Sequence, residues 1–90
     1  MKAADGIAPV AKTLRALVLA AIQRAGEDGL TDEEGIAATG IGPSTYRPRR
    51  IDLATKVGGF RVRDSGRTRL TKSGRKAVVW VCAATHEGEP

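Results

Sequence analysis

The stretch GRTRLTKSGRKAVVW, residues 66–80, decides the fold that we expect of this chain of 90 residues. Its first part holds five cations, which are Arg67, Arg69, Lys72, Arg75 and Lys76. Its last four residues are apolar and end in the only tryptophan of the chain. A disordered basic tail has no need of such an apolar run, and a buried strand does not tolerate so many charges. The pattern therefore predicts a charged loop that is anchored on a packed strand.

A strand is expected on either side of these charges. Residues 60–63, FRVR, alternate apolar and basic side chains, which is typical of a half-buried strand. The run AVVWVCA, residues 77–83, is rich in valine and is expected to return alongside it after a turn at residues 64–66. We expect Phe60 and Trp80 to pack in the core. The sequence thus predicts a β-hairpin with a long basic loop.

Two helices are predicted before this hairpin. Apolar residues recur at spacings of three and four over residues 10–25, directly after Pro9, which is typical of an amphipathic helix. Thr31 and Glu34 form a T-x-x-E capping box, so a second helix is expected to begin directly after Thr31. Leu30 is expected to pair with the hairpin as a very short strand.

A third helix follows a turn. GIGP, residues 40–43, has the composition of a tight turn. The helix is predicted over residues 44–57, with Ser44 or Thr45 as its cap and with Pro48 in or near its first turn. Two glycines after this range are expected to end it.

The helical repeat divides the side chains of this third helix between two sides. The residues that are expected to face the core are Tyr46, Leu53 and Val57. The Tyr46 hydroxyl is expected at the surface. Arg47 and Arg49 project outward or to the flanks. Arg50 lies nearer the apolar side, where it can reach a phosphate, a base edge or a carboxylate.

Two short helices joined by a four-residue turn that contains glycine form a helix-turn-helix motif. A hairpin directly after the second of these helices makes the motif a winged helix. We therefore expect an α+β fold, a three-helix winged helix-turn-helix with a C-terminal β-hairpin wing. The domain is predicted to occupy residues 8–83, between a flexible N-terminal arm at residues 1–7 and a solvated acidic tail at residues 84–90.

The segment TGIGPSTYRPRR, residues 39–50, resembles the turn and recognition-helix start of winged helix-turn-helix proteins. Together with RRIDL and GGFRVRDSGRTRLTKSGRKAVVW, it resembles in particular the small winged-helix group common in bacteriophages, over more than half of the chain. The resemblance implies that helix 44–57 enters the major groove of DNA and that wing 61–76 follows the backbone or the minor groove. The sequence departs from the pattern at Ile36, where these motifs keep a small alanine, and at Gly35, where an apolar residue is expected.

Positive charge is confined to one contiguous third of the chain. Residues 44–77 hold eleven Arg and Lys against Asp52 and Asp64, a net charge of +9, whereas residues 1–43 and residues 78–90 each carry −2, which gives +5 in total. Such a segregated surface indicates a polyanionic partner. Most of these cations are arginine, whose planar fork suits phosphate and guanine. We therefore expect duplex DNA as the partner, and no cofactor.

Ten residues are candidate DNA contacts. Ser44 and Thr45, at the start of the third helix, suit phosphate. Arg47 and Arg49 are the first candidates for base edges, and Arg50 is the third. The wing candidates are Arg67 and Arg69 for a minor groove, and Lys72, Arg75 and Lys76 for phosphate. A transcriptional regulator is the role that these contacts favour.

A protein-interaction module is the alternative, because winged helices also bind proteins and such a chain could act on a host or regulatory protein. Helix 10–25 is rich in alanine and offers a face for homodimer packing or for that protein partner. RNA is a weaker third option, because no exposed aromatic platform is expected.

Catalytic and metal chemistry is not expected. Cys82 and His86 are the only cysteine and histidine, and a structural zinc site needs four ligands. No nucleophile with a base and no phosphate-binding loop is found. ALVLAAI, residues 16–22, is too short to span a membrane, and a single cysteine fits a reducing compartment. We expect a protein of the cytoplasm, of the bacterial host if a phage encodes it, that is not an enzyme.

Overall fold

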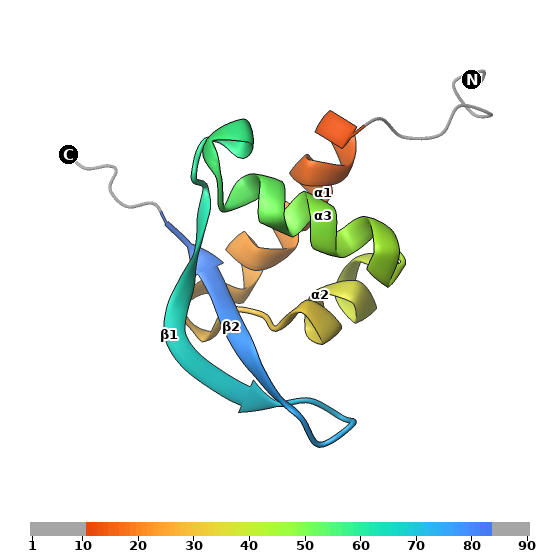
Figure 1. Ribbon diagram of the computed structural model, residues 1–90, viewed down its shortest axis with the longest axis vertical. Coiled ribbons are helices and arrows are strands. Elements are labelled where there is room, and N and C mark those ends of the chain that lie inside the picture. The colour runs from red at the N-terminus through yellow and green to blue at the C-terminus, as the bar shows by residue number, and fades with distance from the viewer. Residues whose placement is uncertain (1–10, 84–90) are drawn as a thin grey trace.

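The computed structural model describes residues 11–83, so the predicted arm, the predicted tail and His86 lie outside the described residues. Three helices precede a two-stranded antiparallel hairpin (Figure 1). The elements are α1 (Ala11–Ala25), α2 (Asp32–Thr39), α3 (Pro43–Leu53), β1 (Val62–Leu70) and β2 (Lys76–Cys82). This α+β order confirms the predicted layout of a three-helix winged helix with a C-terminal hairpin. No helix in the described range is long and apolar enough to cross a membrane.

The helices pack on one another and the hairpin runs along one side of them. In Figure 1, α3 crosses α1, α2 lies below α3, and the tip of the hairpin projects beyond the helices at the bottom. Leu30 pairs with Trp80 through two backbone hydrogen bonds of 2.9 and 2.8 Å, which confirms the predicted short strand. This bridge joins the segment between α1 and α2 to the middle of β2.

The predicted capping box begins α2. The Thr31 hydroxyl accepts the Glu34 N–H at 3.1 Å, and the Glu34 carboxylate accepts the Thr31 N–H at 2.9 Å. Two N–H groups that the helix leaves without partners are thus satisfied. Gly40, at the other end, takes the left-handed conformation of a helix C-cap.

Helix α3 differs from its predicted bounds. It begins at Pro43 with Gly42 as the N-cap, so Ser44 and Thr45 lie inside the first turn and the prediction that one of them caps the helix was wrong. Proline at the first helical position is favourable because its missing N–H has no intrahelical partner there. Pro48 is inside the helix rather than near its first turn.

The end of α3 also lies earlier than predicted, at Leu53 instead of residue 57. Thr55 is extended, and a short 3-10 turn, η3 (Lys56–Gly58), follows. The chain therefore leaves the helical repeat before Val57, which is 69% exposed instead of facing the core. Phe60 has a φ of +53° and is 62% exposed, so its predicted place in the core was wrong as well.

The core is small and mainly aliphatic. Its buried apolar residues are Val18, Ala21 and Ile22 of α1, Tyr46 and Leu53 of α3, Val62 of β1, and Val79 and Val81 of β2. Because neighbouring strand residues point to opposite faces, Trp80 lies on the other face of β2 from Val79 and Val81. It is half-buried and packs against the cluster of Val18, Ile22, Tyr46, Leu53 and Val62, so the predicted contact with the core is confirmed, although the ring is not fully buried.

Tyr46 fixes how α2 and α3 cross. It is fully buried, and a Cβ added to Gly35 would overlap its hydroxyl, so the predicted surface position of that hydroxyl was wrong. Burial and the nearby Asp32 carboxylate raise the pKa of Tyr46 to about 12. The small residue that permits the close crossing is thus Gly35, whereas Ile36 packs against the core.

The hairpin has a longer strand than predicted. Strand β1 continues through residues 64–66, which form an irregularity rather than a chain-reversing turn. Asp64 pairs with Trp80 and Thr68 with Val78, so three residues of β1 face only Val79. Such a bulge bends the strand and increases its twist. The chain reverses at residues 71–75, and most of the predicted basic loop is therefore strand.

Candidate nucleic-acid interface

The outward side of α3 combines one cation with apolar and small residues. Ser44, Arg47 and Ile51 are exposed and recur at spacings of three and four, opposite the buried Tyr46 and Leu53. Ile51 is 49% exposed. This side can therefore present a guanidinium and a branched apolar group to the same partner.

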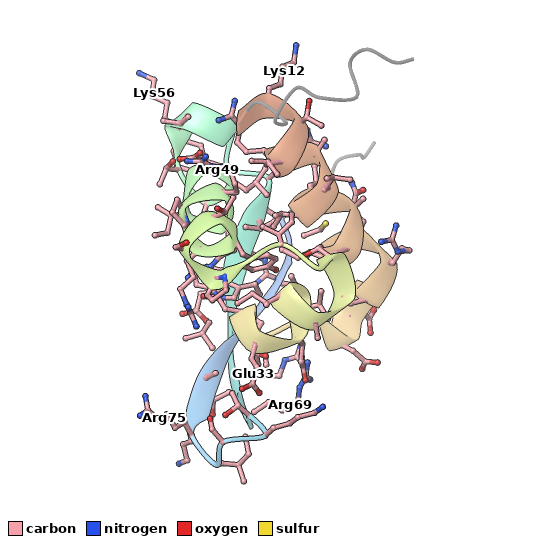
Figure 2. All side chains as sticks on the ribbon, turned by 90° about the vertical axis from the view of Figure 1, so that its right-hand side faces the viewer. Lys12, Glu33, Arg49, Lys56, Arg69 and Arg75 are labelled. Atoms are coloured by element: carbon pink, nitrogen blue, oxygen red, sulfur yellow. The ribbon has the colours of Figure 1, made fainter. Side chains whose placement is uncertain are left out.

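A groove of about 410 Å³ separates α3 from the hairpin tip. It is lined by Asp32 and Glu33 of α2, Arg47 and Arg50 of α3, and Thr71, Ser73, Arg75, Lys76, Ala77, Val78 and Trp80 of the hairpin. In Figure 2, Glu33 and Arg75 lie together at the hairpin end of the molecule. Four cations against two carboxylates leave this groove positively charged.

Three of these cations, which we call the groove cations, remain available to a ligand: Arg47, Arg75 and Lys76. The Arg47 Nε atom is 3.6 Å from Asp32 Oδ2, and its side chain is 52% exposed. Arg75 and Lys76 are exposed, and neither forms an ion pair with another residue of the described range. Helix and hairpin tip thus offer positive charge from two sides of one groove.

Arg50 is held inside the protein. Its Nε and Nη2 atoms donate to the two Asp32 carboxylate oxygens at 2.8 and 2.6 Å. Its guanidinium also lies 4.1 Å from the centroid of the Trp80 ring. Of the partners expected for this residue, the structure shows the carboxylate. The bidentate pair and the cation–π contact hold α2, α3 and β2 together.

Arg49 lies on the flank of α3 that faces α1. Its Nε atom donates to Asp52 Oδ2 at 3.0 Å, and Arg15 of α1 donates to the same oxygen at 3.2 Å. This network separates Arg49 from Arg47, although the sequence assigned both to base edges. The structure does not bring Arg49 into the groove.

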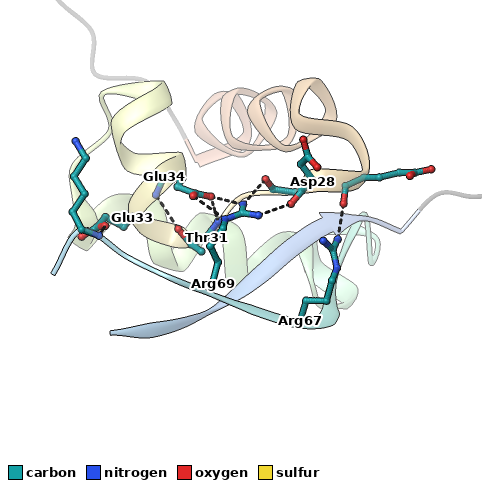
Figure 3. Close-up of polar contacts among 9 residues, drawn as sticks. Asp28, Thr31, Glu33, Glu34, Arg67 and Arg69 are labelled. Carbon is teal, nitrogen blue, oxygen red and sulfur yellow. Dashed lines mark hydrogen bonds and ion pairs between the residues drawn. The ribbon is translucent and has the colours of Figure 1, made fainter. Parts of the chain in front are cut away.

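Arg67 and Arg69, the two candidate DNA contacts on β1, turn back towards the helices (Figure 3). Arg69 donates to both Glu34 carboxylate oxygens at 3.0 and 2.6 Å, and to the backbone carbonyls of Gly29 and Asp28 at 3.0 and 3.2 Å. Arg67 donates to the Glu27 carbonyl at 2.5 Å. Hydrogen bonds from Arg69 hold the pKa of the Glu34 carboxyl below its usual value. These contacts clamp β1 to the segment around α2.

The other three candidates, Lys72, Ser44 and Thr45, lie near the groove without lining it. Lys72 is exposed, and its backbone N–H donates to Glu33 at 2.8 Å, which fixes the turn of the hairpin. Ser44 is exposed at the first turn of α3, and Thr45 beside it is half-buried. No observation tests any of the ten DNA contacts, and they stay predictions.

Three residues at this interface were not singled out from the sequence. Thr71 and Ser73 line the groove, and their hydroxyls are 2.8 Å apart. Their place in the turn could have been inferred from the polar TKSG run. Ile51 could have been found by the helical repeat, because it lies one turn from Arg47.

The described residues contain no group of three or more His, Cys, Asp and Glu side chains that could hold a metal ion. Comparisons with protein-family models, with curated proteins and with solved structures found no match for this chain.

Proposed function

We propose that this chain binds duplex DNA, with α3 in the major groove and the hairpin tip on the backbone or in the adjacent minor groove. The positively charged groove between these elements carries the proposal, because its cations approach from both sides. A helix fits the width of the major groove, and a phosphate strand beside it would then pass between Arg47 and the hairpin tip.

The two carboxylates at this groove already accept hydrogen bonds from inside the protein, which supports an anionic ligand. Asp32 is neutralised by its bidentate pair with Arg50, and Glu33 accepts the Lys72 N–H. The groove cations therefore form no close ion pair with these two carboxylates. A polyanion can replace the one contact that Arg47 makes, at 3.6 Å to Asp32, without leaving a carboxylate bare.

The internal contacts assign different roles to the predicted residues. The groove cations, with Ser44 and Lys72 at their edges, are the contacts that we propose for phosphates and bases. Arg50 and Arg69 would instead hold α3 and the hairpin in position, because their donors already have partners. A transcriptional regulator is the role that we propose.

Fluorescence anisotropy of a labelled random duplex, titrated at several salt concentrations, tests the proposal. Release of about 0.9 counterions per phosphate predicts a log–log slope of about −4 if four phosphates are contacted. The double variant Arg75→Ala, Lys76→Ala is expected to make the slope shallower by about 2, because it removes two phosphate contacts.

The double variant Lys12→Ala, Lys56→Ala is the matched control. It removes the same charge at the end of the molecule opposite the hairpin tip (Figure 2), and it is expected to change the slope by less than half as much. Absence of binding at low salt would reject the proposal. Equal effects of the two double variants would mean that net charge, and not the groove, attracts DNA.

A further inference from the structure

A second groove lies at the end of the molecule away from the hairpin tip. Its volume is about 310 Å³, and its apolar floor consists of Ala16, Leu19, Leu53 and Val57. Its other lining residues are Lys12, Arg15, Gly58 and Arg61. No carboxylate from residues 11–83 lines it. The groove thus combines an apolar floor large enough for a bulky side chain with a cationic rim.

The turn beside this groove holds two large apolar side chains outward. Val57 and Phe60 are both largely exposed, and they lie three residues apart around Gly58 and Gly59. Phe60 has a positive φ, which is an outlier for a bulky residue. The turn therefore adds exposed apolar surface next to the groove.

We infer that this groove and turn form a docking surface for an acidic peptide segment of a partner protein, with a bulky apolar side chain of that segment seated against Val57. The apolar floor would receive the side chain, and Lys12 and Arg61 would face carboxylates on either side of it, beside Arg15, which is already paired with Asp52. Recognition of an apolar anchor flanked by opposite charges is a common mode of peptide binding.

The charges of the rim favour this occupant over a second copy of the chain or a nucleic acid. Two copies that met through this surface would bring cationic rims face to face, and like charges so placed are repulsive. A nucleic acid would match the rim but leave the apolar floor and Val57 uncovered. An acidic segment with an apolar anchor satisfies both features at once.

The docking surface is separate from the proposed DNA interface. Lys12 and Lys56 lie at one end of the molecule in Figure 2, and Arg75 lies at the other. Both ligands can therefore be bound together, and the inference does not depend on DNA binding. A DNA-bound chain would present this end to a protein partner.

The test uses a labelled acidic peptide of about twelve residues, rich in Glu, Leu and Phe, in an anisotropy titration with the full chain. We expect saturable binding that Val57→Asp weakens at least about tenfold, through loss of apolar contact and repulsion of the peptide. Leu70→Asp is the matched control, because Leu70 is another exposed apolar residue, on the hairpin. It is expected to leave the affinity unchanged.

Three results would overturn the inference. One is no saturable binding of the acidic peptide, or equal binding of a peptide in which Lys replaces every Glu. Another is an equal loss of affinity in Val57→Asp and Leu70→Asp. The third is a dimer, measured by sedimentation equilibrium, or binding to anionic lipid vesicles in place of the peptide, that Val57→Asp abolishes. Thermal unfolding of both variants checks that each is folded.

Discussion

Gly35 lies where α2 and α3 cross, and the Tyr46 ring occupies the space that a side chain would fill. Glycine inside a helix is unfavourable by about 1 kcal/mol relative to alanine. Glycine is nevertheless required at this position, because the Cβ of an alanine would overlap a buried aromatic residue whose neighbours cannot move freely. A residue with a poor local preference is thus required by the packing of two elements.

Gly35→Ala is therefore expected to destabilise the protein by about 1 to 3 kcal/mol, the usual effect of overpacking, although it raises helix propensity. Chemical denaturation followed by circular dichroism measures the change. Ala37→Gly, at an exposed position of the same helix, reports propensity alone and is expected to lower stability by about 1 kcal/mol. A gain in stability for Gly35→Ala would contradict the packing argument.

Ile51 leads to a prediction about base preference in the proposed DNA complex. It is an exposed apolar residue one turn from Arg47, and the methyl group of thymine is the apolar feature of the major groove. Ile51→Ala is expected to weaken selection for thymine at one position by about fivefold, and to leave affinity for random duplex unchanged. Selection from a randomised duplex pool measures both. Unchanged base preferences would contradict a contact by Ile51.

At the scale of elements, the hairpin is held against the helices by side chains of β1. Arg69 reaches four acceptors in Glu34, Gly29 and Asp28, and Arg67 reaches one near them. A two-stranded hairpin on its own is marginally stable. These contacts, with the backbone bridge between Leu30 and Trp80, explain how two strands keep a defined place beside three helices.

Glu34→Gln tests the charged part of this clamp, because glutamine can still accept the Thr31 N–H of the capping box. The folded-state pKa of Glu34 lies below its usual value, so the ion pair stabilises the fold fully above the ordinary glutamate pKa of about 4.3. The stabilisation is lost as the pH falls through the folded-state pKa.

The variant is therefore expected to be less stable than the parent by about 0.5 kcal/mol at pH 7, a small value because both side chains are more than a third exposed. The difference is expected to be smaller at pH 3, because the carboxyl is being protonated as the pH falls through its folded-state pKa. Denaturant midpoints at the two pH values measure it, with Glu27→Gln as an exposed control. A difference that stays the same at both pH values would mean that shape, and not charge, is responsible.

The elements themselves could be predicted from the sequence where the signal is local. The capping box, the apolar stripe of α1 and the strand at the end of the chain each depend on neighbours within one or two turns. The partners of Arg69 and Arg50 are 35 and 18 residues away, so no spacing rule could identify them.

The errors in the predicted core and site have the same origin. Val57 and Phe60 fit apolar patterns, but the extended Thr55 and the glycines after it rotate the chain out of that pattern. Trp80 packs against the core, as its type predicts, but it is only half-buried, because it also lines the groove between α3 and the hairpin tip. Arg47 and Arg49 looked equivalent by helical angle, and Asp52 separates them.

On the scale of the whole molecule, the hairpin completes the core. Three of the eight buried apolar residues in the described chain, Val62, Val79 and Val81, belong to its strands. A domain of this size buries a smaller fraction of its surface than a large domain does, and it has little stability in excess. The wing of this fold is therefore a structural part of the domain as well as a candidate contact surface.

A fragment that ends at residue 59 is accordingly expected not to fold on its own. It keeps all three helices but loses the three buried valines and the backbone bridge to Leu30. Loss of this much apolar contact costs several kcal/mol, roughly the stability of a small domain. Thermal scans by circular dichroism would show no cooperative transition for the fragment, and a cooperative one would contradict the prediction. The full chain serves as the folded reference.

The position of Trp80 next to the Arg50 guanidinium makes this tryptophan an intrinsic fluorescent probe of the groove. An indole beside a guanidinium emits according to the polarity and charge around it, and this chain has only one such chromophore. Trp80 also lines the groove between α3 and the hairpin tip. Its emission should therefore shift when an anion fills that groove and stay constant when a peptide occupies the turn near Val57. One unlabelled sample can thus distinguish which end of the molecule is occupied.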